Sequence, residues 1–151
     1  MALKKSLILF LMLALMLLVL GCFEASLGQE TKAMRFQRQH IDSNNFPNGN
    51  ATYCNVMMVC RNMTWGRCKE INTFVHEPLS AVEAICSEKN RTCIKGMKNC
   101  YQSRYPMSIT VCRLRRGSRH PNCTYTTSPI IQQHITVACA GVPYVPVHFE
   151  S

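Results

Sequence analysis

The side chains best suited to acid–base chemistry in this chain of 151 residues are its five histidines. Histidine exchanges a proton near neutral pH, so two of them can supply both a general base and a general acid. None lies in a G-x-S-x-G or H-E-x-x-H frame, which argues against a serine hydrolase and a zinc protease. No metal site is expected, because neither the cysteines nor the histidines have zinc-ligand spacing. The histidines are His40, His76, His120, His134 and His148.

The amino-terminal segment has the features of a secretory signal peptide. Two lysines precede an apolar run from Leu7 to Leu20, which is shorter than the roughly 20 residues of a membrane-spanning helix. Ser26 and Gly28 are the small residues expected before a cleavage site. We therefore predict a leader over 1–28 and a secreted, extracellular domain over 29–151, with no transmembrane segment in the mature chain. An uncleaved signal anchor and a bacterial lipoprotein leader are the alternatives, and four Asn-x-Ser/Thr sequons favour a eukaryotic secreted protein.

The composition is that of a small, basic, disulfide-rich domain. The net charge is +9, and removal of the leader takes away two lysines and one glutamate, which leaves +8. Such a charge attracts polyanions and makes their binding sensitive to salt. Without the leader, nine of the ten cysteines remain, which predicts four disulfides and one cysteine left over. The nine are Cys54, Cys60, Cys68, Cys86, Cys93, Cys100, Cys112, Cys123 and Cys139.

The elements that must position the histidines follow from hydrophobic periodicity and turn residues. Helices are predicted over 31–41, 53–61 and 79–88. A polar loop rich in Asn, Gly and Pro is predicted over 42–52. Because helices come mostly early and strands mostly late, we predict one α+β domain with an antiparallel sheet. The predicted strands, which are rich in β-branched and aromatic residues, are 71–75, 109–112, 125–127, 135–138 and 145–149.

Three stretches of the sequence strongly resemble the pancreatic-type secreted ribonuclease family. They are Q-H at Gln39-His40, C-K-x-x-N-T-F-V-H from Cys68, and P-Y-V-P-V-H-F ending at Phe149. The resemblance spans essentially all of 30–151, and C-K-x-x-N-T-F is highly specific to this family. It implies an α+β fold in which three short helices pack on a bent antiparallel β-sheet. The disulfides that it implies are Cys54–Cys112, Cys68–Cys123, Cys86–Cys139 and Cys93–Cys100.

The resemblance also implies an activity. The expected protein is an endoribonuclease that cuts single-stranded RNA on the 3′ side of pyrimidines through a 2′,3′-cyclic phosphate. His40 would be the base that takes the 2′-hydroxyl proton, and His148 the acid that protonates the leaving 5′-oxygen. Lys69 would stabilise the charge that develops on the phosphoryl oxygens. No metal ion or organic cofactor is implied, because these side chains supply the acid, the base and the charge.

Further positions match the family's contacts with its substrate. Thr73 matches the pyrimidine reader, since a backbone N–H and a hydroxyl can pair with either uracil or cytosine. Taken alone, Thr73 would be an ordinary strand threonine. Phe149 would flank the base, and Asn99 would contact the next base. The other residues expected to bind RNA are Gln39, Arg35, Arg67 and Lys95, together with Lys69.

Three departures from the family's pattern bear on the rate and the base preference. Glu150 stands where the family usually has Asp, and the longer side chain is expected to orient the acid imidazole less well without abolishing activity. Val111 replaces a common acidic residue, so the balance between uracil and cytosine is open. One extra residue around 128–132 should fall in a hairpin loop and leave the histidines in register.

Cys60 has no counterpart in the implied disulfide pairing. It lies about 120° from Cys54 around the predicted helix, which predicts an exposed residue. An exposed thiol in an oxidising compartment either bridges two chains or is capped by a small thiol. A disulfide-linked homodimer through Cys60 and a capped or free thiol therefore both stay open. The resemblance adds the cytosolic ribonuclease inhibitor as an expected partner.

The surface carries modification signals and a basic cluster. Sequons begin at Asn50, Asn62, Asn90 and Asn122, the last of which is the least suited because its middle residue is expected to be disulfide-bonded. Four arginines crowd residues 113–119, and they fit either a solvated turn or a site for RNA phosphates or a glycosaminoglycan. They are Arg113, Arg115, Arg116 and Arg119.

Two other functions compete with RNA cleavage. One is a cationic host-defence protein that acts on microbial membranes with catalysis incidental, which the charge and the arginine cluster favour. The other is a receptor ligand with weakened catalysis. The intact set of His40, Lys69, Thr73 and His148 argues against a scaffold that has lost its activity.

Overall fold

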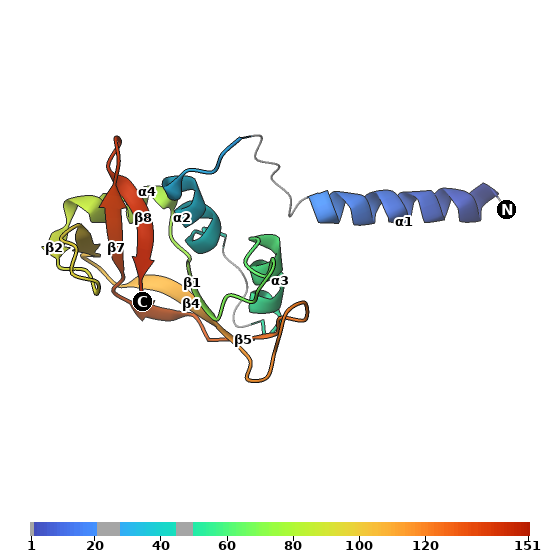
Figure 1. Ribbon diagram of the computed structural model, residues 1–151. Coiled ribbons are helices and arrows are strands. Elements are labelled where there is room, and N and C mark those ends of the chain that lie inside the picture. Colours follow the sequence, from blue (N-terminus) through green and yellow to red (C-terminus); the bar gives the residue numbers. More distant parts are fainter. Residues whose placement is uncertain (1, 21–27, 45–49) are drawn as a thin grey trace.

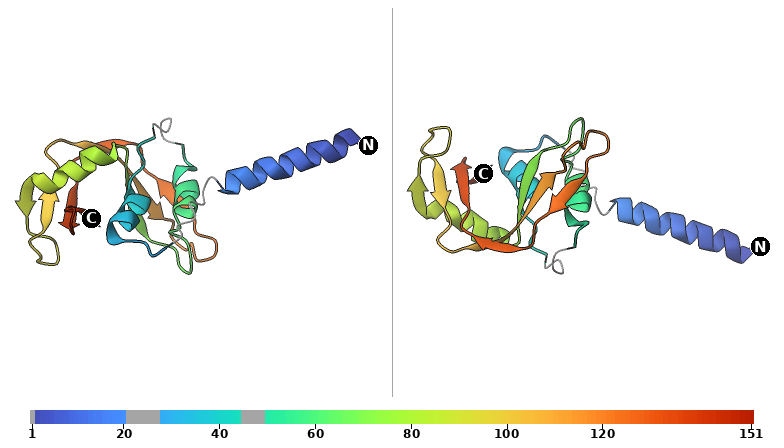
Figure 2. Two further views of the ribbon diagram at one scale, coloured as in Figure 1. Left: turned by 90° about the horizontal axis from the view of Figure 1, so that it is seen from above. Right: turned by 90° about the horizontal axis from the view of Figure 1, so that it is seen from below.

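The computed structural model describes residues 2–20, 28–44 and 50–151 (Figure 1). The apolar leader forms helix α1 (Ala2–Leu20), which lies apart from the other elements in Figures 1 and 2. Within the described ranges, no helix combines the length and the apolar character needed to cross a membrane. Ser26 of the predicted cleavage site lies outside the described residues, as does the middle of the predicted loop over 42–52, and the leader boundary stays a prediction.

The helices of the folded part arise where the sequence predicts them. Helix α2 (Lys32–His40) begins after Thr31, whose hydroxyl accepts the Met34 N–H at 3.1 Å and so satisfies one of the unpaired donors of the first turn. Helix α3 (Tyr53–Cys60) also matches its prediction within one residue. The helix predicted over 79–88 is α4 (Leu79–Glu83) followed by a tighter 3₁₀ turn, η1 (Ala84–Ser87).

Within the described residues, eight strands form two antiparallel four-stranded sheets. The first sheet has the order β1-β4-β5, with β6 also paired to β4, and the second has the order β2-β3-β7-β8. All five predicted strands are present, and β2, β3 and β6 are additional. Each additional strand has three residues, and its pairing partner rather than its own composition makes it a strand. The bounds are β1 (Ile71–Val75), β2 (Lys89–Arg91), β3 (Cys100–Gln102), β4 (Met107–Leu114), β5 (Tyr125–Thr127), β6 (Ile131–Gln133), β7 (Thr136–Ala140) and β8 (Val145–Glu150).

The chain passes three times from one sheet to the other, between β1 and β2, between β3 and β4 and between β6 and β7. The last two crossings are bonded to each other, because the Ser103 N–H donates to the Ile135 carbonyl at 2.8 Å and the Ile135 N–H donates to the Ser103 hydroxyl at 3.0 Å. The two sheets therefore behave as one bent surface (Figure 2). This is the bent antiparallel sheet with packed helices that the sequence predicts.

The two largest hydrophobic clusters of the described residues pack the helices against the sheets. The larger one includes Phe36 of α2, Ile85 of η1 and Val137 of β7. The second lies under α3 and includes Met58 and Tyr125, both fully buried. Burial of these side chains, at about 1.5–3 kcal/mol each, anchors α2 and α3 on the sheets.

Four disulfides join pairs of cysteines that both lie in the described ranges, and they are the four pairs that the resemblance implies. Cys54–Cys112 joins α3 to β4, Cys68–Cys123 joins the segment before β1 to the β4–β5 hairpin, and Cys86–Cys139 joins η1 to β7. Cys93–Cys100 closes a short loop before β3. Each bridge contributes about 2–4 kcal/mol, mainly by restricting the unfolded chain.

The prediction of an exposed, unmatched Cys60 is wrong. Cys60 is half-buried and disulfide-bonded, and no cysteine among the described residues is free. Helical phase describes the faces of one element only and takes no account of the segments that pack around it. The Cys60-linked dimer stays a prediction.

Candidate active site

His40 is the last residue of α2, and its side chain is buried between the helix and the sheets. Its Nδ1 lies 2.8 Å from the Thr73 carbonyl oxygen, and its ring stacks on Phe149 with 5.1 Å between centroids. Because a carbonyl can only accept, Nδ1 carries the proton and Nε2 of the neutral ring is left as a base. Burial lowers the pKa of His40 to about 4; the Thr73 hydrogen bond opposes this shift, and the charges of Lys69 and His148 add to it.

Lys69 is held beside His40 by two side chains. Its Nζ donates to Asn72 Oδ1 at 2.9 Å and to Gln39 Oε1 at 3.4 Å. Asn72 Nδ2 donates in turn to the Gln39 carbonyl at 2.8 Å, which connects β1 to α2. Burial, followed by the charges of Arg38 and Arg67, lowers the pKa of Lys69. The ammonium is therefore partly desolvated and is oriented by its hydrogen bonds to Asn72 and Gln39.

His148 lies on β8, across from Ala138 of β7, and its side chain is 67% exposed. Its Nε2 lies 3.6 Å from Glu150 Oε1. The other carboxylate oxygen, Oε2, accepts the Ile94 N–H at 2.8 Å. Glu150 thus connects the second histidine to the loop that the Cys93–Cys100 bridge closes.

His40, Lys69 and His148 meet in one pocket of about 710 Å³. One wall comes from α2 and the segment between α3 and β1, and the opposite wall comes from β7, β8 and the loop before β3. The two histidines are 108 positions apart in the chain, so only the bend of the sheets brings them to one cavity.

The structure places most of the predicted RNA contacts in the same pocket. Gln39, Arg35, Arg67, Lys95 and Asn99 all line it. Asn99 is fixed there by its Nδ2, which donates to the Cys139 carbonyl at 3.0 Å.

Thr73 and Phe149, the predicted base contacts, are not lining residues of this pocket and lie directly against His40 instead. Thr73 is buried on β1 and pairs with Val111 of β4. The valine that replaces an acidic residue therefore sits directly across the sheet from the predicted base reader. Any effect of Val111 on base preference would reach the base through Thr73.

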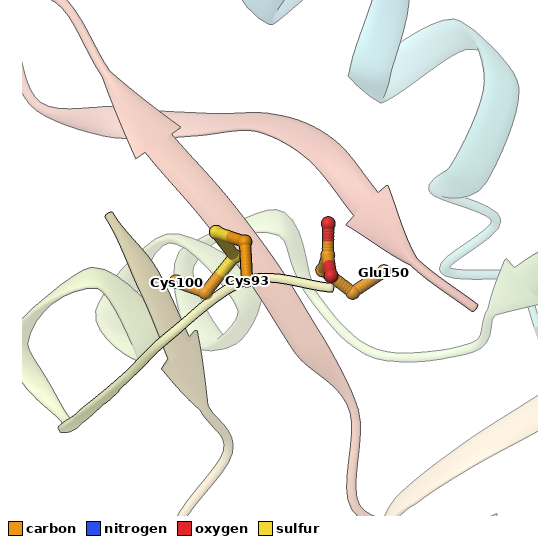
Figure 3. A group of neighbouring side chains, drawn as sticks. All are labelled: Cys93, Cys100 and Glu150. Atoms are coloured by element: carbon orange, nitrogen blue, oxygen red, sulfur yellow. A yellow bond between two sulfur atoms is a disulfide. The ribbon is translucent and has the colours of Figure 1, made fainter. Parts of the chain in front are cut away.

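A cluster of Cys93, Cys100 and Glu150 is close enough for one ion, as Figure 3 shows. The two sulfur atoms are bonded to each other, so neither is a thiolate that can bind a metal. Glu150 is instead engaged by the Ile94 N–H and faces His148.

The other histidines have structural surroundings. The side chain of His76 is buried, with Nε2 2.7 Å from the Thr110 hydroxyl and Nδ1 3.0 Å from the Asp42 carbonyl oxygen. His134 lies 2.8 Å from the Ser103 carbonyl at the crossing between the sheets. His120 is exposed on the β4–β5 hairpin and does not line the pocket.

Two residues of the site were missed from the sequence. Asn72 positions Lys69, but the motif C-K-x-x-N-T-F does not by itself reveal which side chain Asn72 binds. Trp65 lines the pocket and is the only tryptophan of the chain. The available signal was its position three residues before Cys68. An aromatic side chain in a glycine-containing loop next to the C-K-x-x-N-T-F motif is not expected to pack in the hydrophobic core.

Comparison with known proteins agrees with this geometry. The sequence pattern of the family described as "Pancreatic ribonuclease" matches residues 31–150. The protein named "Ribonuclease pancreatic" from Lagothrix lagotricha is 57% identical to this chain over 151 residues, which cover 100% of this chain and 96% of that protein.

Proposed function

The chain belongs to the pancreatic ribonuclease family, and on that premise we propose that it is a secreted endoribonuclease that cuts single-stranded RNA after pyrimidines. One observation carries the proposal. A buried neutral imidazole, a desolvated ammonium and a solvent-facing imidazole converge on one cavity, as His40, Lys69 and His148. Transfer of a phosphoryl group within RNA needs these three functions.

In the first step, His40 Nε2 takes the proton of the ribose 2′-hydroxyl, and the 2′-oxygen attacks the adjacent phosphorus. The bond from phosphorus to the 5′-oxygen breaks, and His148 donates the proton that this oxygen needs. Lys69 stabilises the negative charge on the phosphoryl oxygens. The products are a 2′,3′-cyclic phosphate and a free 5′-hydroxyl.

In the second step, water opens the cyclic phosphate with the two roles exchanged. His148, now neutral, takes a proton from water, and His40, now protonated, returns one to the 2′-oxygen. The return of both side chains to their starting states completes the cycle. Since DNA lacks the 2′-hydroxyl, it would bind without being cut.

The preference for pyrimidines is assigned to Thr73. Its backbone and hydroxyl offer both a donor and an acceptor, which fits uracil and cytosine alike. The Thr73 carbonyl is engaged by His40, so the base reader and the general base are held by the same short segment of β1. Phe149, stacked on His40, would limit the space beside the base.

The decisive experiment uses protein secreted by eukaryotic cells that express the full chain. We would measure initial rates on a cytidine-containing RNA in EDTA, beside the variants His40→Ala and His148→Ala. Cleavage by the wild type and collapse in both variants would support the two-histidine mechanism without a metal. Mass measurement of the secreted chain would test cleavage of the leader after Gly28. An inactive wild type with its four disulfides formed would refute the proposal.

A second function is favoured by one observation. The four arginines of residues 113–119 are exposed, and none of them forms an ion pair with an acidic side chain in the part of the chain that the structure describes. A cationic host-defence protein would use such a surface on anionic membranes. His148→Ala separates the functions, because it keeps the charge cluster and removes the acid. Vesicle leakage that survives this substitution would favour the membrane function.

A further inference from the structure

The segment between α3 and β1 presents the single tryptophan of the chain to solvent. Trp65 is 87% exposed and lines the same pocket as His40 and Lys69. An isolated exposed apolar side chain needs no explanation by itself. Here, however, the exposed indole forms part of the cavity that holds the proposed catalytic residues.

The backbone on both sides of Trp65 is anchored. Met63 is 5% exposed, and its N–H donates to the Met58 carbonyl at 2.9 Å. The Lys69 N–H donates back to the Met63 carbonyl at 3.1 Å, and Cys68 is bridged to Cys123. The intervening turn is thus closed on itself, so the backbone that carries the indole is held at the edge of the pocket before a ligand binds.

Both faces of the indole are available to a ligand. The aromatic pairs found among the described residues do not include Trp65, and its ring is not hydrogen-bonded there either. Tyr105 and Tyr144 are also exposed, but the Arg104 guanidinium lies over the Tyr105 ring at 5.4 Å, and Tyr144 pairs edge-on with Tyr101. Trp65 therefore differs from these two side chains in having an open face beside a cavity.

Three cationic side chains share this pocket with Trp65, and one of them, Arg35, is paired with Glu30 at 3.3 Å. Lys32, Arg35 and Arg67 line the pocket together with Trp65, and all three side chains are exposed. A positive groove with an aromatic face is the arrangement by which proteins hold single-stranded nucleic acids, with phosphates on the cations and a base on the ring.

We propose that Trp65 stacks on a nucleobase of RNA that lies beyond the two nucleotides joined by the cleaved bond. This inference rests on the proposed ribonuclease function, and it makes Trp65 a substrate-binding residue and not part of the acid–base machinery. Stacking tolerates any base, so Trp65 would strengthen binding of long substrates without changing the base preference at the cleaved position.

The test compares a dinucleotide with longer substrates. Each octanucleotide contains one ribocytidine among deoxynucleotides, so that it is cut at one place, and it extends from that place mainly in the 5′ or mainly in the 3′ direction. Trp65→Ala is expected to lower kcat/KM about 5- to 100-fold for at least one octanucleotide and to leave the dinucleotide unchanged. Trp65→Phe should retain most of the wild-type kcat/KM on that octanucleotide, because it keeps an aromatic ring. The control Tyr105→Ala should match the wild type.

Equal rates for the wild type and Trp65→Ala on both octanucleotides would overturn the inference. So would an equal loss on the dinucleotide, because Trp65 would then act on the catalytic site or the fold.

A binding measurement keeps the inference separate from the proposed function. An all-deoxy octanucleotide is not cut, and it should quench the fluorescence of the sole tryptophan, whereas a polyphosphate chain without bases should not. This holds even if the protein proves to have no ribonuclease activity. Absence of quenching by the octanucleotide, with a blue shift on anionic lipid vesicles instead, would assign Trp65 to a membrane and reject the stacking role.

Discussion

The two walls of the pocket hold their histidines in opposite ways. His40 is buried, hydrogen-bonded to the Thr73 carbonyl and packed against Phe36 and Phe149, with centroid distances of 5.2 and 5.1 Å. His148 is 67% exposed, and its ion-pair partner, Glu150, lies 3.6 Å away. His40 is thus held in place and shielded from solvent, whereas His148 is exposed to solvent and only weakly oriented by Glu150.

The difference matches the two proposed roles. A base must be neutral and aligned with a hydroxyl at the start of the reaction, and burial ensures both for His40. The acid must later take a proton from water, and the exposed side chain of His148 is in contact with solvent. In the proposed mechanism, the same residue type takes two roles because one copy ends a packed helix and the other has an exposed side chain on a strand.

Removal of either imidazole tests this comparison with the largest expected effect. Both His40→Ala and His148→Ala should lower kcat on RNA by about 10²–10⁴-fold. With a 4-nitrophenyl ester of uridine 3′-phosphate, whose leaving group needs no proton, only His40→Ala should lose activity. A matching loss in His148→Ala on this ester would contradict its assignment as the acid.

Lys69 is the charged group on the buried wall, and its removal should have the next largest effect. Lys69→Ala should lower kcat by about 10²–10³-fold, because a preorganised donor to the phosphoryl oxygens is lost. Lys69→Arg keeps the charge and should recover part of the rate. Arg67→Ala is the matched control, since Arg67 lines the pocket but is exposed, and it should change mainly the salt dependence of KM.

The pH dependence of kcat/KM reports directly on the burial of His40. With a pKa of about 4 instead of 6.5, His40 stays neutral at pH 5, where an ordinary histidine would lose about 30-fold of its base form. The acid limb of kcat/KM should therefore lie well below pH 6.5. A limb centred at 6.5 in a stopped-flow pH series would show that His40 is solvated in the free enzyme.

The same pKa shift makes folding stability depend on pH. The unfolded chain binds a proton at His40 below about pH 6.5, whereas the folded chain resists it until about pH 4. The free energy of unfolding should therefore fall as the pH is lowered through this window. Urea denaturation of the wild type and of His40→Ala at pH 7 and pH 4.5 measures the effect, and the variant should lose less stability.

Substitutions of Glu150 test the wall of the pocket that carries His148, and they are expected to have the smallest effect. An ion pair with an exposed imidazole is worth at most about 1 kcal/mol, so Glu150→Gln should lower kcat no more than about fivefold. Glu150→Asp shortens the side chain that also accepts the Ile94 N–H, so one of the two contacts should weaken. Glu83→Gln on α4 is the control. A loss near that of His148→Ala would mean that the exposed histidine is held far more tightly than its solvent contact indicates.

Much of the fold was predictable because its signals are local. Helical spacing located α2 and α3, and β-branched runs located β1, β4, β5, β7 and β8. The three missed strands have no such pattern, because Lys89–Arg91, Cys100–Gln102 and Ile131–Gln133 become strands only through their neighbours. The burial of Cys60 was mistaken for the same reason, since it depends on segments outside its own helix.

The sequence by itself determined the family, the α+β class and the identity of the residues at the centre of the site. These are carried by motifs a few residues long, such as the segment from Cys68 to His76, and by the number of cysteines. Only the tertiary structure decided how those residues differ. Groups distant in the sequence decide whether a histidine is shielded from solvent and which carbonyl its ring is hydrogen-bonded to. They also decide which amide side chain binds the lysine. Solvent exclusion and hydrogen-bond geometry arise only once two bent sheets and two helices have packed around them.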